Sequence, residues 1–345
     1  RIWTKEWHFR IGVHVLQEII TPKAASEQYA QLAQTVLVVV FAFVHREFAR
    51  KYGDIAQSDS TILAMGSLGA GQLNSDSDLD LILIFDADPN ALSDGHKTLA
   101  CRQYFSRLTQ ALITALTAPT AYGRLYEVDM RLRPSGRSGP VATSITGFET
   151  YQRNEAWTWE HLALTRGRAI TGSVEFRKKV EDLRQRILDE KSDWAKVMSG
   201  VSDMRVRLAE SKPQQGLWDI KRGPGGLQDI ELLGQGIALV HHCREVATAA
   251  QLHSGQSAAH LKVGALDELA RSHDWLSDLR LLHRLMCGTD TQDAAVGEGG
   301  RARLFRIAQI DQDLDFEHIV LTKRAHCVQI IDGILGQIEG QGYES

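Results

Sequence analysis

The sequence contains few cysteines, and none of them lies close to another. The four cysteines among 345 residues form no Cys-x-x-Cys pair. Their separation excludes a zinc knuckle and a disulfide scaffold, and it is typical of a protein in a reducing compartment. The remaining composition, with 43% hydrophobic and 24% charged residues, is that of an ordinary globular chain. We therefore expect a cytoplasmic protein.

A basic surplus is also missing. The chain has 39 lysines and arginines against 43 aspartates and glutamates, which gives a formal net charge of −4. Proteins that bind nucleic acid through its phosphates usually carry excess positive charge, often interleaved with aromatic residues. We therefore expect no nucleic-acid partner.

The apolar runs are short. The longest one near the amino end is Val36–Val44, nine residues that are followed by His45 and Arg46. Because about 20 apolar residues are needed to span a bilayer, we expect a buried helix segment here and no membrane partner. The first residue is an arginine and no signal-peptide pattern follows it, so we expect a fragment of a longer protein.

Hydrophobic periodicity divides the chain into a mixed front part and a helical rear part. Helical spacing is found over residues 1–55 and 99–116, and strand-length apolar runs over 61–65, 79–85 and 125–132. No strand is expected after residue 148. The later segments that favour helix are 148–169, 175–190, 196–210, 227–243, 258–287 and 301–338, with a loop expected over 288–300.

A glycine-rich turn follows the first of these apolar runs. Gly66, Gly69 and Gly71 fall within six residues and remove side chains where phosphate oxygens would approach backbone N–H groups. Ser67 adds a hydroxyl donor. The turn is therefore a candidate phosphate-binding loop, although such a loop by itself is a weak signal.

Two aspartates follow this turn at the start of the next strand. Ten residues separate Ser67 from Asp78, and Asp80 lies two positions further on, in the apolar run Leu79–Phe85. Alternate residues of a strand share one face, about 6.5–7 Å apart, so the two carboxylates repel unless a cation lies beside them. Hard dications such as Mg²⁺ prefer oxygen ligands and leave positions open for phosphates.

A third acid is expected from the run Leu125–Leu132. Strand alternation places the charged residues of this run on one face, namely Glu127, Asp129, Arg131 and Arg133. Two dications need more negative charge than two aspartates supply. Asp129 is the preferred third ligand and Glu127 the alternative, while the neighbouring arginines suit planar phosphate recognition.

Together these residues match the nucleotidyltransferase superfamily, whose pattern is a Gly-Ser or Gly-Gly turn, an Asp-x-Asp strand and a later acidic strand. The chain also resembles the glutamine synthetase adenylyltransferase family over nearly its whole length. Three further segments carry this resemblance: Val128–Gly136, Glu155–Arg166 and Asp219–Glu231. The chain departs from that family at Ser67, where a lysine is common, and at Gln72, where a glutamate is common.

The resemblance implies an α+β fold with a polymerase-beta-like nucleotidyltransferase domain, a small mixed sheet with helices, followed by an all-helical bundle domain. On this basis we expect a helical lead-in over 1–55, the catalytic domain over 56–172 and the helical domain over 173–345.

The resemblance also implies the reaction, in which AMP passes from ATP to a tyrosine hydroxyl of glutamine synthetase and pyrophosphate leaves. The family has a second, related half that removes AMP by phosphorolysis, and this reaction is the alternative. The stretch Ala156–His161 resembles the attaching half. A regulatory module that binds nucleotide or the signalling protein PII is an alternative of another class. PII and glutamine are the implied regulators of the full-length enzyme.

The implied roles fall on the residues already singled out. The catalytic and metal-binding role, with Mg²⁺ or Mn²⁺, goes to Asp78, Asp80 and Asp129, of which Asp129 also takes the tyrosine proton. The nucleotide-binding role goes to Gly66, Ser67, Arg131, Arg133 and Lys221.

For Lys221 a structural reading stays open beside the nucleotide-binding role. Lys221 precedes Gly225 and Gly226, which serve equally well to let the chain enter a helix at residue 227. Trp157, Trp159 and His161 are expected to pack in the core between the domains and not to stack on adenine.

Overall fold

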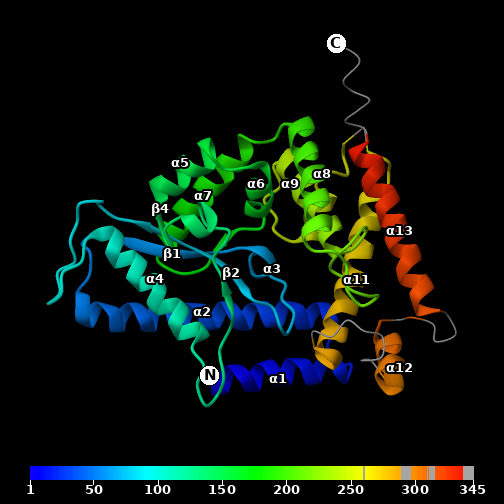
Figure 1. Cartoon of the computed structure of the whole chain (residues 1–345), viewed down its shortest axis with the longest axis horizontal. Helices are drawn as coiled ribbons and strands as arrows, with labels where there is room; N and C mark the ends of the chain where they lie inside the picture. Colours follow the sequence, from blue (N-terminus) through cyan, green and yellow to red (C-terminus); the bar gives the residue numbers. More distant parts are fainter. Residues whose placement is uncertain (259–260, 289–296, 309, 311–314, 337–345) are drawn as a thin grey trace, which may run out of the picture. The chain divides into compact units, whose positions relative to one another are not determined.

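The computed structural model describes residues 1–258, 261–288, 297–308, 310 and 315–336 (Figure 1). They form two compact units. The first consists of Arg1–Arg10, Glu27–Leu73 and Ser77–Glu190, and the second of Ile11–Ser26, Asn74–Asp76 and the chain from Lys191 onward. The domain boundaries expected from the sequence, at 55 and 172, stay a proposal, and the compact units divide the chain elsewhere.

A small mixed sheet forms the centre of the first unit. Its strands are β1 (Asp59–Ala64), β2 (Leu79–Asp86), β3 (Val128–Asp129), β4 (Ala142–Ser144) and β5 (Arg168–Ala169). The order is β3-β2-β1-β5, and β4 also pairs with β2. β1 runs antiparallel to β2 and β5, whereas β2 runs parallel to β3 and β4. The expected mixed sheet with helices is therefore present.

The central strand β2 is buried from its start almost to its end. Leu79, Leu83 and Phe85 are each at most 5% exposed, and Phe85 stacks on Phe105 with the ring centroids 4.1 Å apart. Burying such side chains stabilises the fold by roughly 1.5–3 kcal/mol each. The apolar run from which this strand was predicted is thus the core of the sheet.

Two predictions about strands are wrong. The strand expected over 125–132 is only Val128–Asp129, because the chain turns at Arg131, whose backbone N–H donates to Asp129 Oδ1 at 2.8 Å. The expectation of no strand after residue 148 fails at β5, which pairs Ala169 with Leu63. A strand of two residues has no periodicity from which it can be predicted.

The first unit also contains helices, and two helices near the amino end are shared with the second unit. α1 and α2 contribute residues to both units. The helices up to residue 190 are α1 (Ile2–Leu16), α2 (Pro22–Tyr52), α3 (Gly66–Gly69), α4 (Cys101–Thr117), α5 (Ile145–Asn154), α6 (Thr158–Leu164) and α7 (Val174–Asp189). The single helix predicted over 148–169 is in fact α5, α6 and β5.

From residue 191 onward the described secondary structure is helical. The helices are α8 (Trp194–Ser211), α9 (Leu227–Val240), α10 (Thr248–His253), α11 (Ala265–Cys287), α12 (Gly297–Ile307) and α13 (Phe316–Leu335). The loop expected over 288–300 falls mainly on 289–296, which lie outside the described residues, and α12 begins at Gly297. That these helices form a bundle domain stays a prediction.

One helix among the described residues, α2, is long and apolar enough to cross a membrane by length and composition alone. In its most apolar window 33% of the residues are buried. The core helices of soluble proteins pass the same test, so this is weak evidence for a membrane span.

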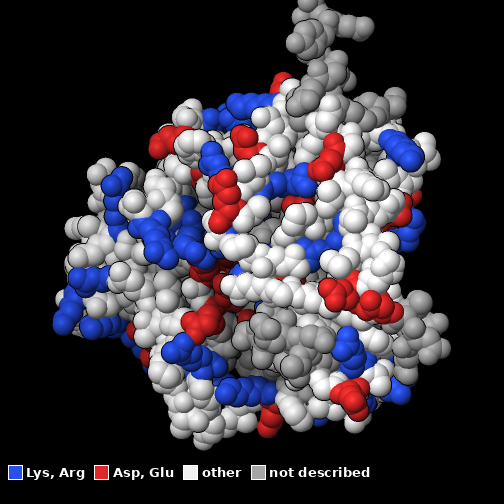
Figure 2. All heavy atoms as spheres, turned by 45° about the vertical axis from the view of Figure 1, so that its right-hand side comes forward, with Lys and Arg blue, Asp and Glu red and all other residues white. Residues whose placement is uncertain are grey.

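On the face drawn in Figure 2, acidic and basic side chains adjoin one another, as expected from their near balance in the sequence.

Candidate active site

The turn after β1 brings the main chain against an aspartate of β2. Gly66 has a φ of +55°, and a Cβ at this position would collide with Asp80 Oδ2. The backbone N–H of Met65 donates to the Asp80 carbonyl at 2.9 Å. Only a residue without a side chain therefore lets the Asp80 carboxylate lie directly beside the turn.

Gly69 and Ser67, which lie in the same turn, differ from Gly66 in their surroundings. Gly69 is buried, and a Cβ there would collide with the Arg166 carbonyl, so its small size serves packing. The expectation that Gly69 gives access to phosphate is therefore wrong. Ser67 lies at the start of α3, and no partner of its hydroxyl is recorded among the described residues.

The pairing of β2 with β3 brings two aspartates together. In this parallel pair Asp80 is the register partner of Asp129, and Leu79 that of Val128. Register partners on adjacent strands lie about 4.8 Å apart and point to the same side. Asp78 lies just before β2 and is exposed. The charges of Asp78, Asp80 and Asp129 all act on the same side chain, that of Arg131.

Arg131 lies among these acids. Its Nε donates to Asp129 Oδ2 at 2.7 Å, and its backbone N–H donates to Oδ1 at 2.8 Å. Burial alone would raise the pKa of Asp129, but these bonds outweigh burial and hold the pKa below its ordinary value. Asp129 raises the pKa of Arg131 most, and the charges of Asp80 and Asp78 add to this effect.

The donor chemistry of the three aspartates fits a divalent cation. Carboxylate oxygens are the ligands that Mg²⁺ and Mn²⁺ prefer. However, both oxygens of Asp129 accept from Arg131, and no group of three or more ligating side chains is arranged to hold an ion among the described residues. The Arg131 side chain therefore competes with a cation for Asp129 Oδ2, and the ligand role of Asp129 stays a prediction.

Arg133 supports its own loop. Its guanidinium donates to the carbonyls of Met130 at 2.8 Å, Gly139 at 3.3 Å and Arg137 at 3.4 Å. It does not continue the face of Asp129, because β3 ends there. A contact between Arg133 and phosphate stays a prediction.

The alternative acid, Glu127, points elsewhere. It is exposed and pairs with Arg124, and only its carbonyl takes part in the sheet, accepting from Leu79 N–H at 2.9 Å. This arrangement favours Asp129 as the third acid.

Lys221 is exposed and lies in the second unit, ahead of α9. The loop after it has a structural explanation. Gly225 has a φ of +66°, a Cβ there would collide with the Arg324 carbonyl, and its N–H donates to Asp229 Oδ2 at 2.9 Å. These contacts support the helix-entry reading of the glycines, and the phosphate contact of Lys221 stays a prediction.

The prediction of core packing for the aromatic stretch is wrong in part. Trp157 is 62% exposed, so it is not a core residue. His161 is buried, 4% exposed, and its Nε2 lies 2.8 Å from the Gln152 carbonyl. Trp159 is half-buried. Trp157 is the N-cap residue of α6, and its backbone N–H donates to Glu160 Oε1 at 3.2 Å. This role at the start of the helix explains its exposed position.

The sequence analysis missed Arg168, which holds α3 in place. Its guanidinium donates to the carbonyls of Leu68 and Gly69, each at 3.4 Å, and to Gln34 Oε1 at 2.8 Å. Burial lowers the pKa of Arg168. An arginine in a two-residue strand gives no sequence signal for such a role.

Two family models match the chain. The model of glutamate-ammonia ligase adenylyltransferases matches residues 1–183, and a model of PII-uridylyltransferases matches residues 202–330.

Curated relatives are bifunctional glutamine synthetase adenylyltransferase/adenylyl-removing enzymes. The one from Xanthobacter autotrophicus is 43% identical over 265 residues, which is 73% of this chain and 27% of the relative. The one from Bradyrhizobium diazoefficiens is 42% identical over 76% of the chain and 27% of the relative. The one from Mesorhizobium japonicum is 47% identical over 68% and 24%. The chain thus spans about a quarter of the length of these relatives.

Proposed function

Because the chain belongs to the glutamate-ammonia ligase adenylyltransferase family, we propose that its first unit transfers AMP from ATP to a tyrosine hydroxyl of glutamine synthetase. Pyrophosphate leaves, and glutamine synthetase is down-regulated in nitrogen control. The observation that carries the proposal is the register pairing of Asp80 with Asp129 beside Gly66. Two adjacent carboxylates next to a glycine at the start of a turn are suited to a nucleotide with its cation.

The three aspartates are the proposed ligands of Mg²⁺ or Mn²⁺. When bound, the cation would neutralise charge on the phosphates and lower the pKa of the tyrosine hydroxyl, which is near 10 in water. The backbone of Asp80 is fixed by its pairing with β3 and by the Met65 N–H bond. We assign Asp129 the ligand role, and acceptance of the tyrosine proton as its second role.

Phosphate binding is assigned to the turn and to Arg131. The Ser67 hydroxyl, without a recorded partner in the described part of the chain, is available as a donor. Arg131 is exposed and close to all three acids, so its guanidinium can exchange Asp129 for a phosphate when the carboxylate turns to the cation. One side-chain movement would then create both contacts.

The direction of the reaction is proposed from the Ala156–His161 stretch, which resembles the attaching half of the family. The test incubates the 345-residue chain with unmodified glutamine synthetase, ATP and Mg²⁺. A mass gain of one AMP per subunit supports attachment. Loss of AMP from the adenylylated substrate with inorganic phosphate, without any gain in the first reaction, supports the removing reaction instead.

We also propose that PII and glutamine regulate the full-length enzyme in the cytoplasm. The match of residues 202–330 to PII-uridylyltransferases supports a link to PII. A purely regulatory module is distinguished by calorimetry. We expect Mg-ATP binding that Asp80→Asn abolishes, whereas unchanged binding would favour the regulatory module.

A further inference from the structure

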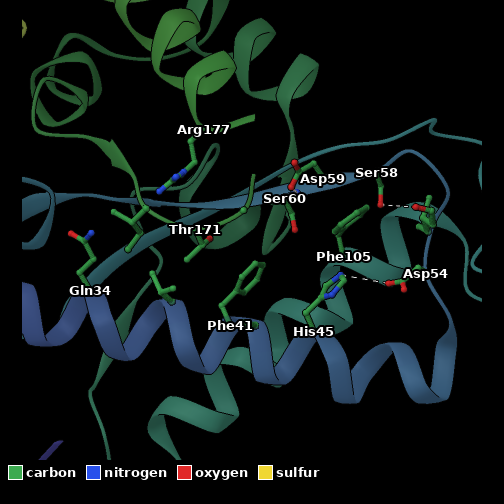
Figure 3. A pocket seen from close by; sticks show the side chains of 15 residues that line it. Gln34, Phe41, His45, Asp54, Ser58, Asp59, Ser60, Phe105, Thr171 and Arg177 are labelled. Atoms are coloured by element: carbon green, nitrogen blue, oxygen red, sulfur yellow. Dashed lines mark hydrogen bonds and ion pairs between the residues drawn. The ribbon is translucent and has the colours of Figure 1, made fainter. Parts of the chain in front are cut away.

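A pocket lies at the end of β1 that is remote from the acids (Figure 3). Ser60 lines it near the start of the strand, whereas Gly66 follows the strand's other end. Five residue steps separate Ser60 from Met65, or about 17 Å at the usual strand rise. The cavity measures about 670 Å³, within the range of small-molecule sites.

Elements of the first unit form its walls. One face of α2 supplies five lining residues at helical spacing, namely Gln34, Val38, Phe41, Ala42 and His45. Phe105 of α4 and Ile170 add apolar surface and are at most 2% exposed. The pocket is therefore built on regular elements and has an apolar lining beneath a polar rim.

The two acids of the pocket already have partners. Asp59 Oδ1 accepts from the Ser60 N–H at 2.7 Å. Asp54 Oδ1 accepts from the Tyr104 hydroxyl at 3.2 Å and lies 3.7 Å from His45 Nε2. These hydrogen bonds orient both carboxylates, which keep their negative charge, so an anion has to bind at the side of the cavity where Arg177 lies.

Arg177 is the one lysine or arginine among the residues that line the pocket. No partner of its guanidinium is recorded among the described residues. Figure 3 shows it on the side of the cavity where Thr171 and Gln34 lie, with His45 and Asp54 on the other side. Its helix, α7, begins at Val174, so the positive end of the helix dipole lies at the same rim.

We propose that this pocket binds a small organic anion, whose carboxylate or phosphate pairs with Arg177 and whose apolar part lies against Phe41. A guanidinium binds either oxyanion through two parallel hydrogen bonds. The apolar lining favours a ligand with a hydrocarbon or aromatic body over a bare inorganic ion. The site is separate from the acid cluster, because none of its lining residues belongs to that cluster.

The test titrates the 345-residue chain with phenylacetate and, separately, phenyl phosphate by calorimetry. Phenethylamine and 2-phenylethanol supply the cationic and neutral bodies of similar size. We expect saturable binding of at least one anion, and the comparison of the two anions identifies the preferred oxyanion. Absence of saturation by both anions, or equally tight binding of the amine or the alcohol, would overturn the proposal.

Two variants and one control locate the site. Arg177→Gln is expected to weaken anion binding about tenfold or more, and Val38→Trp, at a lining residue 41% exposed, to block the cavity. Lys178→Gln removes a charge from the next residue, which is exposed and outside the lining, and should bind as the parent chain does. Equal binding by Arg177→Gln and the parent would place the anion elsewhere. Thermal unfolding confirms that each variant is folded.

Discussion

Asp80 and Asp129 are register partners in the parallel pair of β2 and β3, and Gly66 lies directly against the Asp80 carboxylate. A strand pairing therefore places two acids side by side that are far apart in the sequence. Arg131 neutralises part of this charge by holding Asp129 from both its side chain and its backbone. The site is thus an acid cluster with an arginine counter-ion.

Gly66→Ala tests the close approach of the turn. The new Cβ would collide with Asp80 Oδ2 and would also strain a φ of +55°. We expect the free energy of unfolding to fall by about 1–3 kcal/mol, together with a loss of AMP transfer. Gly71→Ala is the matched control, because Gly71 has a φ of +76° but open space around its Cβ position. Equal effects of the two substitutions on AMP transfer would contradict the role of the contact with Asp80.

Arg131→Gln tests the ion pair through its pH dependence. Because the folded-state pKa of Asp129 lies below its ordinary value of 3.8, the pair stabilises the fold above that pH. This contribution is lost as the pH falls through the lowered pKa. We expect the variant to unfold at a lower temperature than the parent at neutral pH, with a difference that shrinks from about pH 5 towards about pH 2. A difference independent of pH would show that packing, and not charge, is lost.

The carboxyl group of Asp278, in the second unit, should give the stability of the fold the opposite pH dependence. Burial, and then the charge of Asp274, raise its pKa from 3.8 to about 6. The raised pKa contributes stability below the unfolded-state value, and this is lost as the pH rises to about 6. Asp278→Asn should therefore gain stability relative to the parent between about pH 4 and about pH 6, as measured by thermal unfolding. An unchanged difference across this range would contradict the raised pKa.

The sequence predicts those parts of the fold that carry long patterns. β2 was predicted because its residues form an unbroken apolar run, and Asp78 and Asp80 because they open it after a glycine turn. β4 and β5 were not predicted, because three and two residues have too little periodicity and depend on partners far along the chain.

The details of the site depend on tertiary contacts in the same way. The turn at Arg131 ended the strand expected over 125–132, and it redirected Arg133 to the carbonyls of its own loop. Arg168 acts on α3 from a distant segment, which no local pattern reveals. Residue types at the site were therefore predictable, whereas their partners were not.

The most direct test of the account compares two aspartates at the two ends of one strand. Asp80→Asn removes an acid of the cluster, and Asp86→Asn removes one at the far end of β2, where it pairs with Lys179. With ATP, Mg²⁺ and unmodified glutamine synthetase, we expect Asp80→Asn to reduce the rate of AMP incorporation by roughly 100-fold or more, with Asp86→Asn close to the parent. Incorporation by Asp80→Asn at the parent rate would contradict the assignment of the site.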